Sequence, residues 1–316
     1  MLGGSATVDS LLNDPDLQIE KPPGWFCDAT AGVFNSLVQD NMDAKVEEMR
    51  AMLQPEYRRW LAFYLVKSRA SKEVNFHVAY IEFFEKLQNL QQEGLMNLVT
   101  DVTYDCLHVL LGSVDQAVLS TSHRTVLKNL GYWLGQITLA RNKPLKSKRM
   151  DMKYALADAF ENGRLTAVLP LVCKVLEGVS KSKVYKLPNP WTTAIMSLLV
   201  EIHDIPNLRT NLMFEVEVLC KHLDIKIGDL KRSDLLAAKR PPAGSHDLSA
   251  AARTTATAAA EGKPEATDDK PAVPAVSGGL RAEAAEWSGA TKDTDASRTG
   301  AAGALGGLHG LGAQGQ

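Results

Sequence analysis

The side chains best suited to catalysis or metal binding are the seven histidines and four cysteines of this chain. They are His77, His108, His123, His203, His222, His246 and His309, with Cys27, Cys106, Cys173 and Cys220. A metal centre needs such ligands at short spacing, and acid–base catalysis needs a facing pair of groups. Neither pattern occurs, and phosphate-binding glycine loops and HExxH or GxSxG motifs are also missing from the sequence. The sequence therefore predicts no metal, no cofactor and no catalysis by this chain alone.

A basic cluster is the first candidate binding site. Its members are Arg141, Lys143, Lys146, Lys148 and Arg149, in a loop that also contains Pro144. Cations this close together can contact RNA phosphates or an acidic protein partner. A solvated loop without a ligand is the other interpretation, because no aromatic residue that could stack on bases is interleaved with the cations.

A second candidate site lies on an aromatic helix expected at residues 75–90. Its aromatic residues exceed the number that one buried stripe can hold, so some should stand on a groove. The candidates are Arg69, Asn75, Phe76, His77 and Tyr80. Exposed aromatics beside arginine are typical anchors of protein interfaces. Core packing is the alternative role for the same side chains.

Helices must position both sites, and we expect the segment 122–144 to form the central helix against which the others pack. Leu127, Leu130, Leu134 and Ile137 recur at spacings of three and four, which predicts one buried helical face, with Ser122 as the N-cap. Gly131 and Gly135 each cost about 1 kcal/mol against alanine inside a helix. Because they lie four residues apart, they predict a close contact with a neighbouring helix.

The rest of the chain predicts an all-α fold. About ten or eleven helices are expected and no strands, with N-caps at Asn75, Asp151 and Asn189 and a kink or break at Pro170. Short loops between them indicate an α-solenoid of HEAT-like antiparallel helix pairs over residues 22–237. Residues 1–21 are expected to be a flexible segment. Residues 238–316 are rich in Ala, Gly, Thr and Pro, which predicts a disordered low-complexity tail.

Composition adds constraints on location and partners. The formal net charge of the 316 residues is -2, which implies no general attraction to nucleic acid or to membranes. No run of about 18 apolar residues and no secretory signal is visible, so no membrane partner is expected. The scattered cysteines are typical of reduced thiols in a cytosolic or nuclear protein.

Several long segments resemble one known family. LKNLGYWLGQITLARNKP, LPNPWTTAIMSLLVEIH and NLMFEVEVLCKHLDIKIGDLK closely resemble the large scaffold subunit of the Ccr–Not deadenylase complex. The resemblance is to its central domain, which is similar to the middle domain of initiation factor 4G, and it covers residues 22–237. It implies a non-enzymatic HEAT-like scaffold for messenger-RNA deadenylation, decay and translational repression. The family scaffold is several times longer, so this chain is expected to be a fragment or a truncated gene model.

The resemblance also implies partners and their surfaces. A DEAD-box helicase of the decapping and repression machinery is expected at Arg69, Asn75, Phe76, His77 and Tyr80. A Caf-type deadenylase is expected near Pro188, Asn189, Pro190 and Trp191, although Pro190 and Trp191 can also simply start and anchor a helix. Other Ccr–Not subunits are further expected partners, and RNA is a possible but indirect one. The expected location is the cytoplasm, including P-bodies, with the nucleus as a second possible location.

Two alternatives remain open at this point. The basic loop favours a translation-initiation-type adaptor that binds a helicase and RNA directly, which salt-sensitive RNA binding without partners would support. An all-helical hydrolase is the other alternative, and turnover of poly(A) would reveal it.

Overall fold

The computed structural model describes residues 19–90, 94–113, 120–242 and 245–249. All of them belong to one compact unit, Met1–Pro264. The expectations of a flexible segment at 1–21 and a disordered tail at 238–316 fall largely outside the described residues. The α-helices are α2 (Gly24–Asn35), α3 (Met42–Met52), α4 (Arg58–Tyr64), α5 (His77–Asn89), α6 (Leu95–Gly112), α8 (Thr121–Ile137), α9 (Met152–Glu161), α10 (Leu165–Leu176), α11 (Pro190–His203) and α12 (Thr210–His222).

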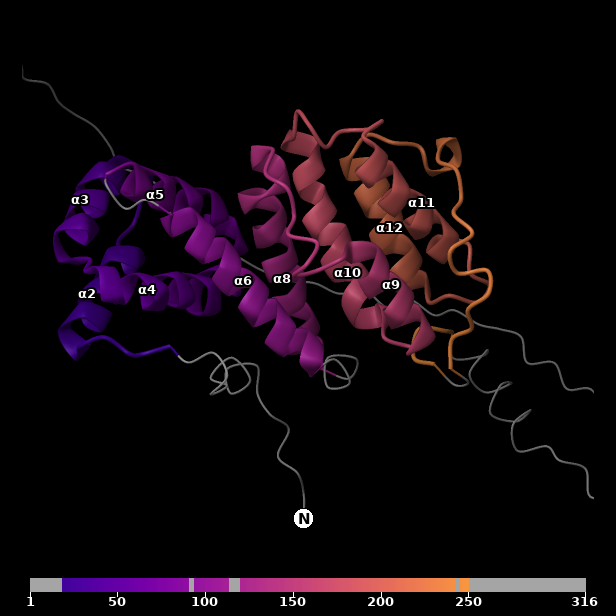
Figure 1. Cartoon of the computed structure of the whole chain (residues 1–316), viewed down its shortest axis with the longest axis horizontal. Helices are drawn as coiled ribbons and strands as arrows, with labels where there is room; N and C mark the ends of the chain where they lie inside the picture. The colour runs from indigo at the N-terminus through magenta and orange to yellow at the C-terminus, as the bar shows by residue number, and fades with distance from the viewer. Residues whose placement is uncertain (1–18, 91–93, 114–119, 243–244, 250–316) are drawn as a thin grey trace, which may run out of the picture. The chain divides into compact units, whose positions relative to one another are not determined.

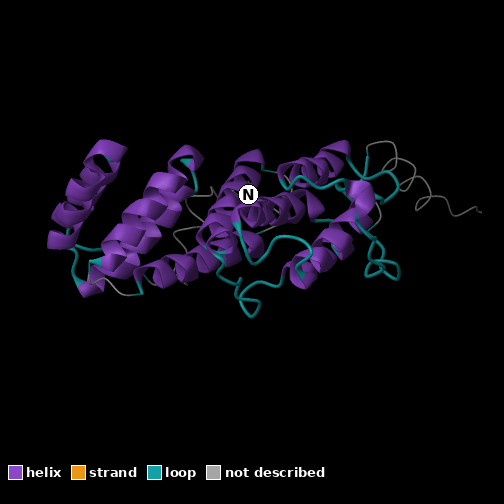
Figure 2. Cartoon of the chain, turned by 90° about the horizontal axis from the view of Figure 1, so that it is seen from above, coloured by secondary structure: helices purple, strands orange, loops and turns teal. Residues whose placement is uncertain are grey.

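These helices form an α-solenoid, as the sequence predicted. In Figure 1 they run from α2 to α5 at one end, through α6, α8 and α10, to α9, α11 and α12 at the other. Helices α8, α10 and α12 pack side by side, while α9 packs on α10 and α11 packs on α12. Helices and loops make up the described ribbon (Figure 2), which contains no strand and only an isolated antiparallel bridge between Leu208 and Leu248.

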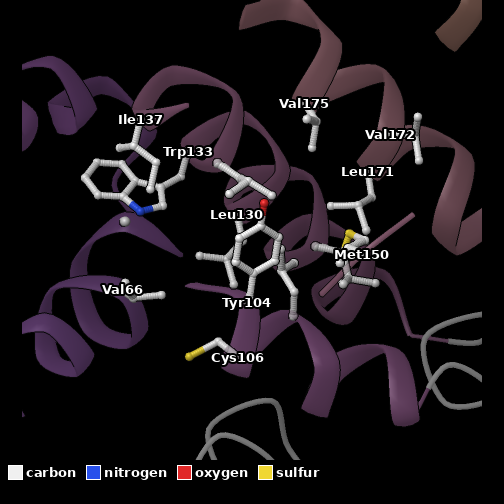
Figure 3. Packing of buried hydrophobic residues seen from close by; sticks show 14 of the residues in the cluster. Val66, Tyr104, Cys106, Leu130, Trp133, Ile137, Met150, Leu171, Val172 and Val175 are labelled. Carbon is white, nitrogen blue, oxygen red and sulfur yellow. The ribbon is translucent and has the colours of Figure 1, made fainter. Parts of the chain in front are cut away.

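The core is continuous, and α8 lies near its middle. Leu127, Leu130, Leu134 and Ile137 are at most 1% exposed, which confirms the predicted face. Trp133 is fully buried, and its indole Nε1 donates a hydrogen bond of 3.2 Å to Thr103 Oγ1 of α6. Figure 3 shows Leu130, Trp133 and Ile137 beside residues of α6 and α10.

The two glycines of α8 make the predicted close helix contact, and α10 is the partner. A Cβ atom added to Gly131 would lie 2.7 Å from the backbone oxygen of Leu171. One added to Gly135 would lie 3.0 Å from the carbonyl carbon of Val175 and closer still to its oxygen. Since only a residue without a side chain fits there, these positions bring the two backbones together.

The helix ends confirm some predicted caps and correct others. Asp151 Oδ1 accepts from the backbone N–H groups of residues 153 and 154, and Asn189 Oδ1 does the same at the start of α11. Ser120, rather than Ser122, caps α8. Asn75 caps no helix, because a short 3-10 turn (Val74–Phe76) precedes α5. Helix α10 runs unbroken through Pro170, so the expected break is wrong.

The folded contacts continue beyond residue 237, where the sequence placed the domain boundary. The buried Asp247 carboxylate accepts hydrogen bonds of 2.9 and 2.8 Å from the N–H groups of Leu165 and Thr166, at the start of α10. Ser249 N donates to the carbonyl oxygen of Asn207 over 2.9 Å. These contacts tie residues 245–249 to the last helices and extend the folded domain at least to Ser249.

Candidate docking surfaces

Two loops that are distant in sequence form one surface, which we call the rim surface: residues 141–153 and 182–191. Asn142 joins them. Its backbone is left-handed, with a φ of 59°, a conformation that asparagine tolerates well. Its Oδ1 accepts hydrogen bonds from Ser182 Oγ at 3.0 Å, from Lys183 N at 2.7 Å and from Val184 N at 3.1 Å.

The rim surface brings together two sets of residues that the sequence predicted separately. Asn189 caps α11 and Pro190 is its first residue, so Trp191 is held at a fixed position and packs edge-to-face on Tyr185 with 5.8 Å between ring centres. Pro188 and Pro190 are exposed. Trp191 borders a small cleft of about 210 Å³ together with Leu145, Ser147, Met150, Asp151, Met152, Lys153 and Ile195. The basic loop and the Pro188–Trp191 segment therefore form one candidate interface.

Ion pairs neutralise much of the basic cluster. Arg141 pairs with Glu85, Lys146 with Asp101 and Arg149 with Asp105. These pairs fasten the loop to α5 and α6. Lys143 and Lys148 are the members of the cluster that have no ion pair among the described residues, and both are exposed. The cluster thus offers less free charge than its composition suggests.

Arg69, in the second predicted site, holds the surrounding structure together. It lies in a π-helical turn (Leu65–Ala70), and its guanidinium lies over the rings of Phe34 and Tyr64. Its Nη2 donates to Tyr64 Oη at 2.6 Å and to Asn35 Oδ1 at 2.7 Å, and its Nη1 lies 3.3 Å from Glu73. Much of its hydrogen-bonding capacity is used inside the domain.

His77 and Tyr80 do not stand on a groove, which corrects the expectation that they are exposed. They are 1% and 2% exposed. His77 Nε2 donates to the carbonyl oxygen of Ala70 over 2.7 Å, and its ring stacks on Tyr132. Tyr80 packs edge-to-face against Phe34, and its hydroxyl donates to Glu73. Both residues anchor α5 in the core.

The exposed part of this site is smaller and includes a residue that the sequence reasoning missed. Asn75 is exposed, Phe76 is 50% exposed, and Val78, which was not a candidate, is 65% exposed. The missed signal was helical phase. The buried face of α5 consists of His77, Tyr80, Ile81, Phe83, Phe84 and Leu87, and Val78 falls outside it. Phe76 has the phase of the buried Phe83, seven residues later, but it lies in the 3-10 turn before α5 and is exposed.

The described residues offer little reactive chemistry. Among them, no three His, Cys, Asp or Glu side chains are placed to hold a metal ion. Burial raises the pKa of the Cys106 thiol to about 12 and also raises that of Cys173, which keeps both as unreactive thiols. None of the helices in this part of the chain combines the length and apolarity needed to cross a bilayer.

Stacked helix pairs with exposed loops and helix faces place the described part of the chain in the α-solenoid class. The comparisons with known proteins identify the family. Residues 18–245 match the family model of the CCR4-NOT transcription complex subunit 1 CAF1-binding domain. The chain therefore belongs to this family of scaffold domains, which bind rather than catalyse. The match extends eight residues past position 237, in line with the contacts of residues 245–249.

Curated relatives carry related names. General negative regulator of transcription subunit 1 of Schizosaccharomyces pombe is 38% identical over 211 residues, which is 66% of this chain and 10% of that protein. The protein of the same name in Saccharomyces cerevisiae is 38% identical over 205 residues, 65% of this chain and 9% of its own length. CCR4-NOT transcription complex subunit let-711 of Caenorhabditis elegans is 33% identical over 239 residues, 72% of this chain and 9% of its length. The chain thus spans about a tenth of the relatives it matches.

Proposed function

We propose that this domain docks a Caf-type deadenylase through the rim surface and so places the nuclease on messenger RNA. The description of the matched family as a CAF1-binding domain supports the partner. The observation that supports the surface is the single hydrogen-bonded unit that Asn142 makes of the two loops. A preorganised surface loses little entropy on binding, which favours affinity.

The exposed side chains of the rim surface suit such an interface. Val184 is 54% exposed, Trp191 is half-buried, and Pro188 is exposed. Lys143 and Lys183 are exposed around them. An apolar centre with a charged rim is the usual anatomy of a protein–protein interface, and the lysines favour an acidic partner surface.

Val184→Asp tests the rim surface, with Val218→Asp as its matched control. The two valines are 54% and 53% exposed, and Val218 lies on α12, outside the rim surface. Capture of the purified deadenylase by Val184→Asp should be about tenfold weaker, while Val218→Asp binds normally. Equal binding by both variants, with unchanged melting curves, would refute the rim surface as the docking site.

The second proposed partner is a DEAD-box helicase at the surface around Phe76. Phe76, in the 3-10 turn before α5, and Val78, in the first turn of α5, are both large apolar side chains exposed to solvent, and exposed apolar residues that lie close in the chain can mark an interaction site. Binding both enzymes would raise their effective concentration on one message and so promote deadenylation and repression. Such a complex would act in the cytoplasm, including P-bodies, and in the nucleus.

Phe76→Glu tests this surface, with Phe214→Glu as the control. These side chains are 50% and 56% exposed, and Phe214 lies on α12. Helicase pull-down should fall about tenfold with Phe76→Glu alone. Undiminished pull-down by folded Phe76→Glu would refute this docking site.

The translation-initiation-type adaptor predicts direct RNA binding, which a filter-binding assay over a salt series measures. Because three of the five cluster cations are paired with carboxylates, we expect only weak binding by the isolated domain. Tight, salt-sensitive binding that Lys143→Glu weakens would instead support the adaptor.

A further inference from the structure

A separate cleft of about 380 Å³ lies between α6, the loop before α9, and the start of α10. Its lining includes the apolar side chains of Leu111, Ala155 and Val168. Tyr154 stands at its edge with 72% of its surface exposed, the largest exposure among the exposed large apolar residues of the described part. Lys148, Arg149 and Arg164 also line it. The volume is sufficient for one or two side chains of a ligand.

The two carboxylates that line this cleft are already occupied. Asp151 Oδ1 accepts from two backbone N–H groups at the start of α9, at 2.9 and 3.1 Å. Asp158 Oδ2 accepts from Arg164 at 2.8 Å, and its Oδ1 accepts from Asn162 at 3.1 Å. Their structural tasks leave them poorly placed to receive the cations of a ligand.

The cations, in contrast, have donors to spare. Lys148 has no ion pair among the described residues. Arg149 donates to Asp105 through Nη2, and its Nε, which has no hydrogen-bond partner within the described part of the chain, is buried and therefore out of reach of a ligand. Arg149 and Arg164 are each held in place by a carboxylate. The charged groups of the cleft that keep spare hydrogen-bonding capacity are therefore cations, and they lie beside His108, Ser147 and an apolar floor.

We propose that this cleft binds a short linear peptide of a partner protein, in which an apolar side chain is flanked by Asp or Glu. The apolar residue fills the space over Ala155 and Val168 and packs on Tyr154, because aromatic residues are frequent anchors of interfaces. The flanking carboxylates accept from Lys148 and from the fixed guanidinium groups, as charge-assisted hydrogen bonds favour. A nucleic acid fits less well, since one aromatic and a local group of cations make no track along a backbone.

This docking site shares residues 147–151 with the rim surface, but Tyr154 belongs to the cleft alone. Tyr154 lines the 380 Å³ cleft and is absent from the cleft beside Trp191. Its exposure also means that its substitution leaves the core intact. Tyr154→Ser therefore separates the two proposals.

Selection of a random 16-residue peptide library on the purified chain tests the proposal. We expect enriched peptides to share an apolar residue flanked by Asp or Glu. In fluorescence polarisation, the best peptide should bind Tyr154→Ser and Lys148→Glu about tenfold or more weakly than the unmodified chain. Lys143→Glu, an exposed lysine of the same loop outside this cleft, should bind normally.

Several results would overturn the proposal. They are the absence of enrichment, a basic consensus, or a peptide that binds Tyr154→Ser as tightly as the unmodified chain. Preferential binding of single-stranded RNA at the same residues would also overturn it. Deadenylase capture, run in parallel, should be unchanged in Tyr154→Ser; loss of that capture would assign the cleft to the deadenylase interface instead.

Discussion

Gly135→Ala is the sharpest test of how α8 and α10 are packed. A glycine inside a helix is normally improved by alanine, by about 1 kcal/mol. At Gly135 the new methyl group would meet the backbone of Val175, with the carbonyl carbon at 3.0 Å and Cα at 3.2 Å, both inside the 3.4 Å where ordinary contact begins. Backbone atoms cannot rotate away as a side chain can, so the whole of α10 must move.

The crowding extends to a second partner, which increases the cost. Gly178 packs against the backbone of Gly135 from the turn that follows α10, so any movement of α8 there is resisted as well. Overpacking of a close-packed core costs about 1–3 kcal/mol, and for this site we expect a net loss in that range after the gain in helix propensity. For a domain of this size the melting temperature should fall by about 2–12 °C.

Gly32→Ala is the matched control, measured by urea and thermal unfolding. Gly32 lies inside α2, and a Cβ built there meets nothing within 4 Å. Its substitution should raise the free energy of unfolding by about 0.4–1 kcal/mol. A lower free energy of unfolding for Gly135→Ala together with a higher one for Gly32→Ala would confirm the close backbone contact. A gain in stability from Gly135→Ala would refute the packing of α8 against α10 described above.

Substitutions at three other buried residues should also change the stability of the domain. Leu134→Asp should abolish folding because it buries an unpaired charge, whereas Leu235→Asp, at a position that is 44% exposed, should leave a normal melting curve. Burial lowers the pKa of His77, so its contribution to stability is complete above about pH 6.5 and is lost as the pH falls towards the lowered folded-state pKa. The free energy of unfolding of His77→Gln should accordingly fall less between pH 7.5 and pH 5.5 than that of the unmodified chain. An equal fall in both proteins would show that His77 is not the source of this pH dependence. Asp247→Ala removes the acceptor for two N–H groups of α10, which should cost about 1–2 kcal/mol in urea unfolding; an unchanged midpoint would show that residues 245–249 do not hold α10.

The sequence could define the rim surface only in part. Asn189, Pro190 and Trp191 were recognisable because capping and the first helical position are local rules, and their geometry agrees with those rules. The joining of that segment to the basic loop was not recognisable. It depends on Asn142, which accepts hydrogen bonds from residues 40 to 42 positions away along the chain.

The sequence by itself determined the all-helical fold, the buried face of α8 and the need for a close approach at Gly131 and Gly135. These follow from periodicity and from glycine, which act within one helix. Tertiary structure alone decided which helix fills that approach, which cations remain unpaired, and that Phe76 is exposed. The physical reason is that periodicity and glycine act within one helix, whereas ion pairs and the choice of a neighbouring helix depend on residues that are far apart in the sequence.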